Sequence, residues 1–551
     1  MSKPRQRTKR EQPRKDSKDK RVNFDNTRVS KFERDVKEDK EDRDPRNMRK
    51  TRACNDIAWY ANNPELLRSA ASIPFSNTTG LKLPWKSATN FQMVTPGVMA
   101  MTWVPSLGGA FTDAINQAKN SIYSYTVHAN SRNTSYTASD EMLLILAGAQ
   151  LFSFLANGIR AYGTMKLFDQ RNTYLPEGLI AAMGFDYADL KANLGQMWFD
   201  LNEMIARSSQ IWIPNNLPFI ERWFWMNSNI YMDASSVKAQ YYVFSPACPM
   251  KYDETYNEEG GALVPVVLPY PDDDTTFWHW GLEEGAASSS THTWAQFRDV
   301  INEMFDALLN SEDRGIIFGD ILKAYGADKI YAINPISADY VITPQYDLEV
   351  LTQIENATTY QNYPDAFAQS QTTLDIYTKW GTTQGVLPVA MQPPAGTLLN
   401  FHQLEVPTPG QVMVATRLKV GGAVGSNPGG AWNTVIPSTM GTEYLYGIYV
   451  VYNNYNAFGS SGKPVPYFQE YQQYDGSSKT ATADVFYAEL AFDWCPWHYR
   501  TSANTTIPAN NSAYNDSYVT GAFGDYDYYT DVPDDITITM PSEVAVSRYR
   551  I

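Results

Sequence analysis

Residues 139–168 read SDEMLLILAGAQLFSFLANGIRAYGTMKLF, and this stretch decides the fold because a helix of that sequence is apolar on nearly every side. Asp140 and Glu141 stand at its start, where the positive end of the helix dipole favours negative charge. Residues 142–159 have about the length that spans a bilayer, but three polar side chains interrupt them. These are Gln150, Ser153 and Asn157. We therefore predict the central, buried helix of a large folded protein rather than a membrane span.

Apolar side chains recur at helical spacing around this stretch, from residue 53 to about residue 331. At the first of these helices, Asn63 is a suitable cap, Pro64 suits the first turn and Glu65 suits the positive end of the dipole. A second stripe comprises Leu190, Leu194, Met197, Leu201 and Met204. A third comprises Trp294, Phe297, Val300, Ile301, Met304, Phe305 and Leu308. A packed core explains such spacing better than a ligand site does, so these helices are interpreted as scaffold.

Beyond about residue 335 the pattern becomes that of strands, with alternating, β-branched and aromatic residues. The predicted strands are residues 411–420, 443–452, 484–494 and 535–540. A loop rich in Gly, Pro and Asn is predicted over residues 421–433. Residues 245–292, where Pro, Gly, Asp and Ser separate short extended pieces, are predicted to form a long loop region or an excursion away from the helices. A helix-rich half followed by a strand-rich half indicates an α+β fold whose two parts form separate domains.

The first 52 residues differ from the rest of the chain in charge. They hold 20 basic and 11 acidic residues, a net charge of +9, whereas the remaining 499 residues hold 25 and 49, a net charge of −24. The few apolar residues among the first 52 cannot bury enough surface to offset the entropy of ordering, so residues 1–52 are predicted to be a disordered arm. Charge sorted along a chain in this way indicates a polyanionic partner.

The basic side chains near the start of the arm are the predicted nucleic-acid-binding site. They are Lys3, Arg5, Arg7, Lys9, Arg10, Arg14, Lys15, Lys18, Lys20 and Arg21. Because no base-reading motif or aromatic platform accompanies them, binding should rest on phosphate contacts and be independent of sequence. One arm alone would bind weakly at physiological salt, so retention of nucleic acid requires many arms on one assembly. A solubilising tail is the competing interpretation.

Other kinds of chemistry receive little support from the sequence. Cys54, Cys248 and Cys495 lie far apart, and the five histidines lack metal-ligand spacing, so neither a disulfide framework nor a metal site is predicted. No G-x-S-x-G nucleophile motif occurs. We predict no catalytic residue, no metal and no cofactor. The N-terminus lacks the apolar segment of a secretory signal, which favours synthesis in the cytosol.

Four stretches of the chain resemble the capsid proteins of picobirnaviruses. The first two are NDIAWYANNPELLRSAASIPFS at residues 55–76 and TPGVMAMTWVPSLG at 95–108. The others are SIYSYTVHANSRNTSYTASDEMLLILAGAQLFSFLANGIRAYG at 121–163 and ADLKANLGQMWFDLN at 188–202. The resemblance is clearest over residues 53–215, and the length, the basic mixed-charge head and the helix-then-strand order agree with it.

The resemblance implies a protein that self-assembles as symmetric, intertwined dimers into a small icosahedral shell around a double-stranded RNA genome, with the arm on the inner side. It implies a mainly α-helical shell domain at residues 53–235 and a β-rich projecting domain at 236–500, which would include helices near 294–326. Residues 501–551 would form a C-terminal segment that returns to the shell. The protein would be synthesised and assembled in the host cytoplasm and would reside in the virion.

Some members of this family cleave themselves near the end of the arm, and capsids contact a host membrane or receptor during infection. No residue of this chain assigns either property to it. Two other classes of protein compete with a capsid protein: a surface glycan-binding protein rich in Tyr and Trp, and a non-viral RNA-binding scaffold protein. Closed shells of uniform size in negative-stain images would distinguish the capsid protein from both.

Overall fold

The structure is a computed structural model, and only part of the chain is described here. It describes residues 64, 65, 68, 97–106, 111, 113–131, 134–167, 175–234, 239–257, 260–267, 280, 282, 285–286, 291–359, 364–380, 397–402, 405–426, 433–439, 441–458, 464–470, 492–496, 498–501, 519–523 and 528–532. The chain divides into two units, Met1–Ser76 and Asn77–Ile551. In the first unit, Pro64, Glu65 and Arg68 are helical, where the sequence predicts a helix to begin.

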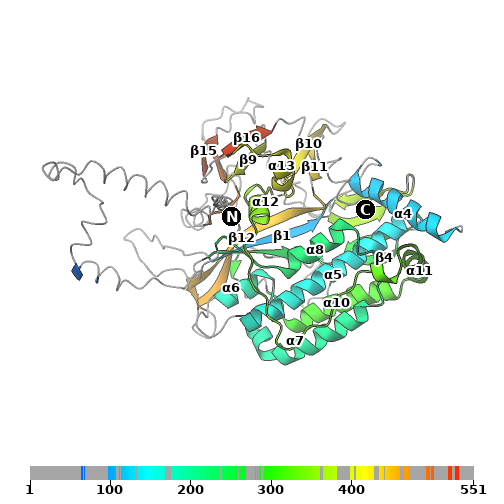
Figure 1. Cartoon of the computed structure of the whole chain (residues 1–551), viewed down its shortest axis with the longest axis horizontal. Helices are drawn as coiled ribbons and strands as arrows, with labels where there is room; N and C mark the ends of the chain where they lie inside the picture. The colour runs from blue at the N-terminus through cyan, green and yellow to red at the C-terminus, as the bar shows by residue number, and fades with distance from the viewer. Residues whose placement is uncertain are drawn as a thin grey trace, which may run out of the picture. The chain divides into compact units, whose positions relative to one another are not determined.

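The centre of the second unit is helix α5 (Ala138–Leu167), which is buried from Ser139 through Thr164. Helices on several sides enclose it: α4 (Ala114–Asn130), α6 (Leu175–Ala182), α7 (Tyr187–Ser208), α8 (Pro218–Ser228) and α10 (Trp294–Leu309). Figure 1 shows α5 between α8 on one side and α10 and α7 on the other. By length and composition α5 could cross a membrane, but its apolar window lies entirely inside the protein. The prediction of a central buried helix is confirmed.

Two glycines of α5 allow neighbouring segments to approach its backbone closely. A β-carbon at Gly158 would lie 2.5 Å from the Cζ atom of Phe297 in α10. A β-carbon at Gly148 would lie 2.9 Å from the Cγ2 atom of Ile213, in the segment between α7 and α8. Side chains larger than hydrogen would force these neighbours to move. The glycines therefore set the distance at which α10 and this segment pack against the central helix.

The main sheet contains strands from both halves of the chain, in the order β2-β3-β1-β12-β13-β6. These are β1 (Val98–Pro105), β2 (Tyr231–Met232), β3 (Tyr241–Pro246), β6 (Gly285–Ala286), β12 (Glu443–Phe458) and β13 (Pro464–Glu470). Strand β1 is parallel to β3 and antiparallel to β12. Every residue of β1 is buried, as expected for a central strand covered on both faces. The prediction of a strand at 443–452 is confirmed by β12.

One hydrophobic core joins the helices to this sheet. It includes residues from Val98 in β1 to Trp494, which follows the strands of the main sheet in the chain. Helices α6 and α8 contact the sheet directly. The α+β class is confirmed, and the predicted boundary between residues 235 and 236 falls inside one sheet and one core. The division into a shell domain and a projecting domain concerns the assembled particle and stays a prediction.

Shorter sheets account for the other strands. The sheet β4-β5-β7-β8 packs on α5 and α10 through β4 and β5. Its strands are β4 (Met250–Asn257), β5 (Gly260–Pro265), β7 (Pro364–Gln369) and β8 (Ile376–Trp380). Three two-stranded sheets combine β10 (Val420–Ser426) with β11 (Asn433–Thr439), β9 (Thr397–Phe401) with β16 (Tyr528–Val532), and β14 (His498–Thr501) with β15 (Val519–Phe523). A small apolar cluster contains Leu399, Phe401 and Ala415, separate from the main core.

The prediction of a strand over residues 411–420 is wrong, because helix α13 (Pro409–Ala415) occupies the first half of this stretch and a turn follows it. The hydroxyl of Thr408 accepts a hydrogen bond from the backbone N–H of Gln411, and the Gln411 side chain accepts one from the N–H of Thr408. This reciprocal pair is a capping box, and Pro409 suits the first helical turn. The hydrogen bonds of the helix cap therefore outweigh the preference of the β-branched residues for a strand. Strand β10 begins only at Val420.

Both predicted loop regions contain strands. Residues 245–292 include the antiparallel pair β4 and β5, and residues 421–426 lie in β10, which pairs with β11. Cross-strand hydrogen bonds fix these segments despite their glycine content. Residues 492–494 form a coil and turn rather than the end of a strand. The other residues of 484–494, and all of 535–540, lie outside the described residues.

The helices predicted near residues 294–326 are confirmed as α10 and α11 (Arg314–Tyr325). Helix α10 begins with a capping box, in which Thr293 and Gln296 exchange side-chain and backbone hydrogen bonds. All seven apolar residues of its predicted stripe are buried. The spacing of apolar residues was therefore sufficient to predict both the existence and the inner face of this helix.

A buried arginine of α5 connects the helix to its neighbours. The guanidinium of Arg160 donates to the backbone carbonyls of Met226, Asn229 and Phe244, at 3.2, 2.9 and 2.6 Å, and to the side-chain oxygen of Asn157 at 2.6 Å. Burial lowers the pKa of Arg160 to about 9, which keeps it charged at neutral pH. The contacts satisfy carbonyls at the end of α8 and in β3, and so attach both elements to α5.

A buried carboxylate connects β12 to α8. Glu443, at the start of β12, accepts hydrogen bonds from the Nε atoms of Arg222 at 3.1 Å and Arg417 at 2.9 Å. Burial by itself would raise the pKa of Glu443, but the charges of Arg417 and Arg222 outweigh it and lower the pKa to about 2. One carboxylate thus serves two guanidinium groups, and the three side chains together carry a net charge of +1.

We expect Gly158→Ala to lower the free energy of unfolding by about 1–3 kcal/mol, because the new methyl group would displace the buried ring of Phe297. Gly319→Ala is the matched control in α11, since a β-carbon there meets no heavy atom within 4 Å. The control should gain about 0.5–1 kcal/mol from the higher helix propensity of Ala. Urea denaturation of purified subunits measures both changes, and equal shifts would contradict the close packing at Gly158.

We expect Glu443→Gln to destabilise the protein by about 3–5 kcal/mol at neutral pH, because two buried guanidinium groups would lose their counter-charge. The folded-state pKa of about 2 lies below the ordinary value of 4.5. The stabilisation is therefore complete above about pH 4.5 and is lost as the pH falls toward 2. Unfolding measured from pH 2 to 6 should show this dependence in the wild type and a weaker one in the variant. Identical profiles would contradict the assignment.

Candidate functional site

The predicted nucleic-acid-binding residues all lie outside the described residues. They are Lys3, Arg5, Arg7, Lys9, Arg10, Arg14, Lys15, Lys18, Lys20 and Arg21. Their role stays a prediction that rests on the charge of the arm. The described residues show the surface of the folded unit, and this surface would make the contacts of a shell-forming or ligand-binding protein.

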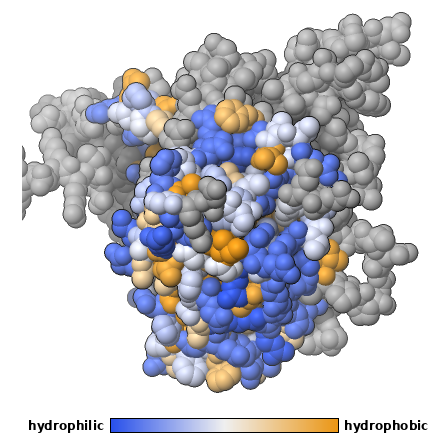
Figure 2. Space-filling model, turned by 90° about the vertical axis from the view of Figure 1, so that its right-hand side faces the viewer, coloured by the Kyte–Doolittle hydropathy of each residue, from blue (hydrophilic) through white to orange (hydrophobic). Residues whose placement is uncertain are grey.

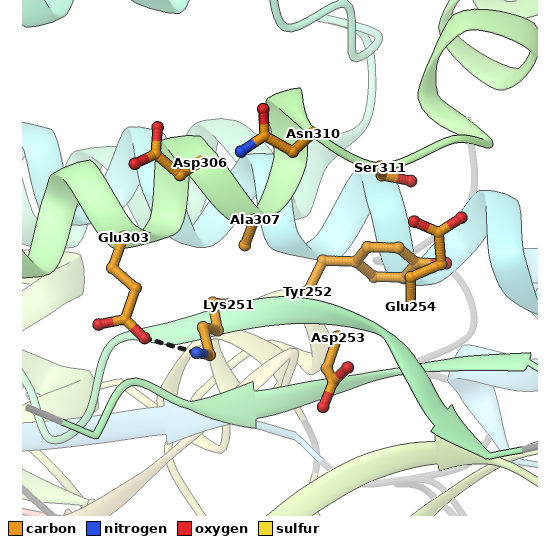
Figure 3. Close-up of a pocket in the computed structure, with 9 residues that line it drawn as sticks. All are labelled: Lys251, Tyr252, Asp253, Glu254, Glu303, Asp306, Ala307, Asn310 and Ser311. Carbon is orange, nitrogen blue, oxygen red and sulfur yellow. Dashed lines mark hydrogen bonds and ion pairs between the residues drawn. The ribbon is translucent and has the colours of Figure 1, made fainter.

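The described part of the chain contains an open cleft of about 420 Å³ between β4 and the C-terminal half of α10. Figure 3 shows its lining, which consists of Lys251, Tyr252, Asp253, Glu254, Glu303, Asp306, Ala307, Asn310 and Ser311. The helical period brings the α10 residues to one face opposite the strand. Four carboxylates and one ammonium line the cleft, and Lys251 forms an ion pair with Glu303. The cleft is therefore acidic.

Burial and like charge govern the ionisation of groups beside the cleft. Burial raises the pKa of Asp313, and the nearby carboxylates of Glu254 and Asp140 raise it further. Burial also raises the pKa of Tyr252, with Asp140 and Asp313 contributing in the same direction. These negative surroundings repel polyanions. The cleft consequently has the wrong charge for the backbone of a nucleic acid.

Within the described ranges, no three His, Cys, Asp or Glu side chains are grouped so that they could hold a metal ion. His292 stacks on Trp280, with ring centroids 4.7 Å apart. The Nε2 atom of His402 lies 2.6 Å from a carboxylate oxygen of Glu355. Both histidines are thus engaged in contacts that join segments of the fold.

Large apolar side chains are exposed at several places on the surface. They are Phe111, Tyr125, Trp198, Phe199, Val267, Ile316, Val341, Tyr346, Leu348, Leu374, Val406 and Met413. Figure 2 shows one face of the molecule, where hydrophilic residues predominate and hydrophobic ones form separate patches. Trp198 and Phe199 are neighbours on α7, and Phe199 is 60% exposed. Exposed aromatic pairs of this kind are typical of surfaces that contact another protein.

An extended segment lies beside this part of α7. We call residues 331–346 the strap, because they run across the helices almost entirely without regular secondary structure. The indole N–H of Trp198 donates to the carbonyl of Ile336 at 3.1 Å, and the hydroxyl of Tyr162 donates to the carbonyl of Ala338 at 2.7 Å. These bonds attach the strap to α7 and α5, and so hold one side of Trp198 in place.

The sequence predicted the inner face of α7 and gave no account of its outer face. Leu190, Met197, Leu201 and Met204 of the predicted stripe are buried, and Leu194 is partly buried. The outer face carries five exposed residues with little or no polar side chain: Ala188, Ala192, Gly195, Phe199 and Ala206. They recur every three, four or seven residues, which is the helical period. These residues therefore lie on the side of α7 opposite to its buried stripe.

Comparisons with known proteins assign this architecture to a family. The family model described as picobirnavirus capsid protein matches residues 59–375, which is more than half of the chain. The capsid protein precursor of a human picobirnavirus, strain Human/Thailand/Hy005102/-, is 29% identical over 315 residues. That match covers 55% of this chain and 54% of the precursor, so the chain spans about half the length of this relative.

Similarity of fold to a known capsid protein extends over a longer part of the chain than similarity of sequence does. The X-ray crystallographic structure of the picobirnavirus capsid matches with a TM-score of 0.69 at 23% sequence identity, over 90% of this chain and 98% of that chain. Members of such a family are structural proteins rather than enzymes, and membership displaces the glycan-binding and non-viral scaffold alternatives. The match over residues 59–375 shows that this chain belongs to the picobirnavirus capsid protein family.

Proposed function

We propose that this capsid protein assembles as dimers into a small icosahedral shell around a double-stranded RNA genome, and that its arm holds RNA without sequence preference. Membership of the capsid family supports self-assembly into a virion. The observation that carries the RNA part of the proposal is the separation of charge, +9 in residues 1–52 against −24 in the remaining chain. A polyanion is attracted to the first segment and repelled by the second.

The acidic cleft supports the same division of roles. Its lining offers four carboxylates and a single lysine that is already paired with Glu303. A phosphate backbone close to this surface would meet a negative potential, since no cation there is free of a carboxylate partner within the lining residues. Contact with RNA therefore falls to the basic arm, where Arg and Lys can neutralise phosphates and release counterions.

We propose that the helical region at 53–235 forms the continuous shell, that much of 236–500 projects outward, and that 501–551 returns to the shell. The separate apolar cluster around α13 and β9 supports a projecting part, because it does not share the main core. Figure 1 shows α12 (Leu348–Glu355), α13, β9, β10 and β11 on the side of the main sheet opposite to α5, α10 and α7. Strand β3, helix α10 and strand β12 share the core of the shell region and belong with it.

The proposed location is the virion, after synthesis and assembly in the host cytoplasm. Contacts with a host membrane or receptor would follow during infection. The buried position of α5 means that this helix does not present its apolar surface to a membrane in the folded subunit. Receptor contact would fall to the projecting segments, since these face away from the helical layer (Figure 1).

We expect deletion of residues 1–46 to leave folded subunits but to abolish retention of RNA, because the deletion removes most of the positive charge of the arm. The ratio of absorbance at 260 and 280 nm of purified shells, with extraction of their nucleic acid, measures retention. A second variant keeps the length of the arm and replaces its ten predicted binding residues with Gln. Shells of either variant that retain RNA at the wild-type level would contradict the role of the arm.

We expect binding of a short RNA duplex by the wild-type subunit to weaken with salt, with a log–log slope of roughly −4 to −5 for about five neutralised phosphates. The affinity should be the same for duplexes of unrelated sequence, since phosphate contacts carry no sequence information. Fluorescence anisotropy at several salt concentrations measures both quantities. A slope near zero, or a strong preference for one duplex, would rule out non-specific electrostatic binding.

A further inference from the structure

We propose that Glu141 is the proton-binding group of a pH-sensitive joint between α4, α11 and the start of α5. Glu141 holds a proton when the joint is closed, and loss of that proton loosens α11. The joint lies within one folded subunit, so it can be tested whether or not shells form. We call the buried residues that meet there the α4–α11 joint: Thr126, Asn130, Tyr136, Glu141, Asp320 and Tyr325.

Helices α4 and α11 pack against each other at one end of the helical layer (Figure 1). The side-chain amide of Asn130, at the end of α4, donates to the backbone carbonyl of Asp320 at 3.0 Å. The hydroxyl of Tyr136, just before α5, donates to the carboxylate of Asp320 at 3.2 Å. The rings of Tyr125 and Tyr325 are in contact, with centroids 4.9 Å apart. These contacts attach α11 to α4 and to the segment that leads into α5.

The hydrogen bonds of Thr126 indicate that Glu141 carries a proton. The hydroxyl oxygen of Thr126 lies 2.6 Å from Oε1 of Glu141 and 3.2 Å from the carbonyl oxygen of Ile122. A hydroxyl has one hydrogen and can serve only one of these two acceptors. If Glu141 is a neutral acid, its O–H donates to Thr126, and Thr126 donates to Ile122. Both contacts are then satisfied, whereas an ionised Glu141 leaves one of them without a hydrogen.

The burial of Glu141 favours the same neutral form. The residue is 1% exposed, and its Oε2 atom has no hydrogen-bond partner in the described part of the chain. No Lys, Arg or His of the described ranges forms an ion pair with it. A buried carboxylate without a counter-charge or a full set of hydrogen bonds is costly, which favours the protonated acid. Burial accordingly raises the pKa of Glu141 to about 7.

The acidic groups that face Glu141 add negative charge. Asp320 of α11 is 3% exposed, and its carboxylate raises the pKa of Glu141 further. The hydroxyls of Tyr136 and Tyr325 interact with the charge of Glu141, and burial raises the pKa of both phenols above the ordinary value of 10. Both phenols therefore stay neutral where Glu141 titrates, and the second carboxylate makes ionisation of the first less favourable.

The cations of α4 and α11 are engaged away from Glu141. Lys119 is buried and pairs with the aspartate that precedes β8. The exposed Lys323 ammonium lies 3.5 Å from a backbone carbonyl at the end of α4. His128 and Arg314 contact other backbone carbonyls. Neither helix therefore supplies a counter-charge to Glu141.

The neighbouring acidic residue, Asp140, interacts with the start of α5 instead. Its carboxylate accepts hydrogen bonds from the backbone N–H and the hydroxyl of Thr137, at 2.9 and 2.8 Å. On the strands that pack against α5, Tyr252 interacts with the charge of Asp140, and Lys251 is paired within the acidic cleft. Asp140 thus serves the cap and dipole of the helix, and Glu141 is the carboxyl group enclosed between α4 and α11.

The direction of the pH dependence follows from the two states of Glu141. In the closed joint its pKa is about 7, and on opening it returns toward the ordinary value of 4.5. The closed joint binds the proton more tightly, so this stabilisation is complete below about pH 4.5 and is lost as the pH rises through 7. A shell built from such subunits would be tightest in acid and would loosen at alkaline pH.

Hydrogen exchange of the full-length protein tests the joint. The protection factors of backbone amides in α11, which are corrected for intrinsic exchange, should fall at least about tenfold between pH 5 and pH 8. Helix α10 serves as the internal reference and should change less, because Glu141 does not lie against it. Equal protection of α11 at both pH values would overturn the proposal.

Glu141→Gln is the decisive variant, because its amide can donate to Thr126 as the protonated acid does and cannot ionise. Its α11 should stay as protected at pH 8 as that of the wild type at pH 5. Asp320→Asn removes the neighbouring charge and keeps an acceptor for Tyr136, so it should move the transition to lower pH. Glu203→Gln, at an exposed position of α7, is the matched control and should leave the transition unchanged.

A second measurement separates proton binding from a merely structural role. Infrared difference spectra between pH 5 and pH 8 should show the carbonyl band of a buried carboxylic acid in the wild type, and this band should be missing in Glu141→Gln. A wild type without such a band would contradict proton binding, even if the variant failed to fold. A pH dependence of α11 that persists in Glu141→Gln would assign it to another group and overturn the proposal as well.

Discussion

The burial of α5 is the constraint on which the rest of this structure depends. A 30-residue helix that is apolar on nearly every side must be enclosed completely, because each exposed apolar side chain would cost free energy of hydration. Helices α4, α6, α7, α8 and α10 and the strands β4 and β5 supply that enclosure. The helix also carries the polar groups that its neighbours need, since Arg160 satisfies carbonyls of α8 and β3.

Enclosure of one helix explains why the chain does not separate into a helical part and a strand part. Strand β1 lies between β3 and β12, which are about 140 and 340 residues further along the chain. The buried group of Glu443, Arg222 and Arg417 attaches β12 to helix α8, although these two elements are more than 200 residues apart in the sequence. A subunit with such long-range connections is suited to a shell, because its helical and strand segments share one core. In the proposed function, RNA binding is assigned to residues 1–52, on the basis of their charge.

Helix α7 has two faces of different character. Its inner face follows the apolar period and is buried, and its outer face follows a second period of small residues around Phe199. Its outer residues are exposed in the part of the chain that the structure describes, so they add little to the stability of that part.

Local pattern in the sequence was enough for the longest apolar helices and for the division of charge. The apolar period predicted α5, α7 and α10 correctly, because burial of one face is a property of a single segment. The charge of residues 1–52, and hence the predicted arm, is likewise a matter of composition. Composition misled at residues 411–420, where a capping box at Thr408 and Gln411 starts a helix. The ten predicted binding residues lie outside the described chain, so that part of the site rests on sequence alone.

Only the tertiary structure decided which distant segments meet. Nothing in the composition of β1 or β12 indicates that they pair, because register between strands depends on the packing of the whole sheet. The three-charge group around Glu443 and the strap beside α7 are contacts of the same long-range kind. The outer face of α7 could be recognised only after its inner face was placed, because exposure is a property of the folded unit. Sequence thus determined the long apolar helices and the distribution of charge, because both are properties of single segments, and three-dimensional packing determined the surfaces that remain for other molecules.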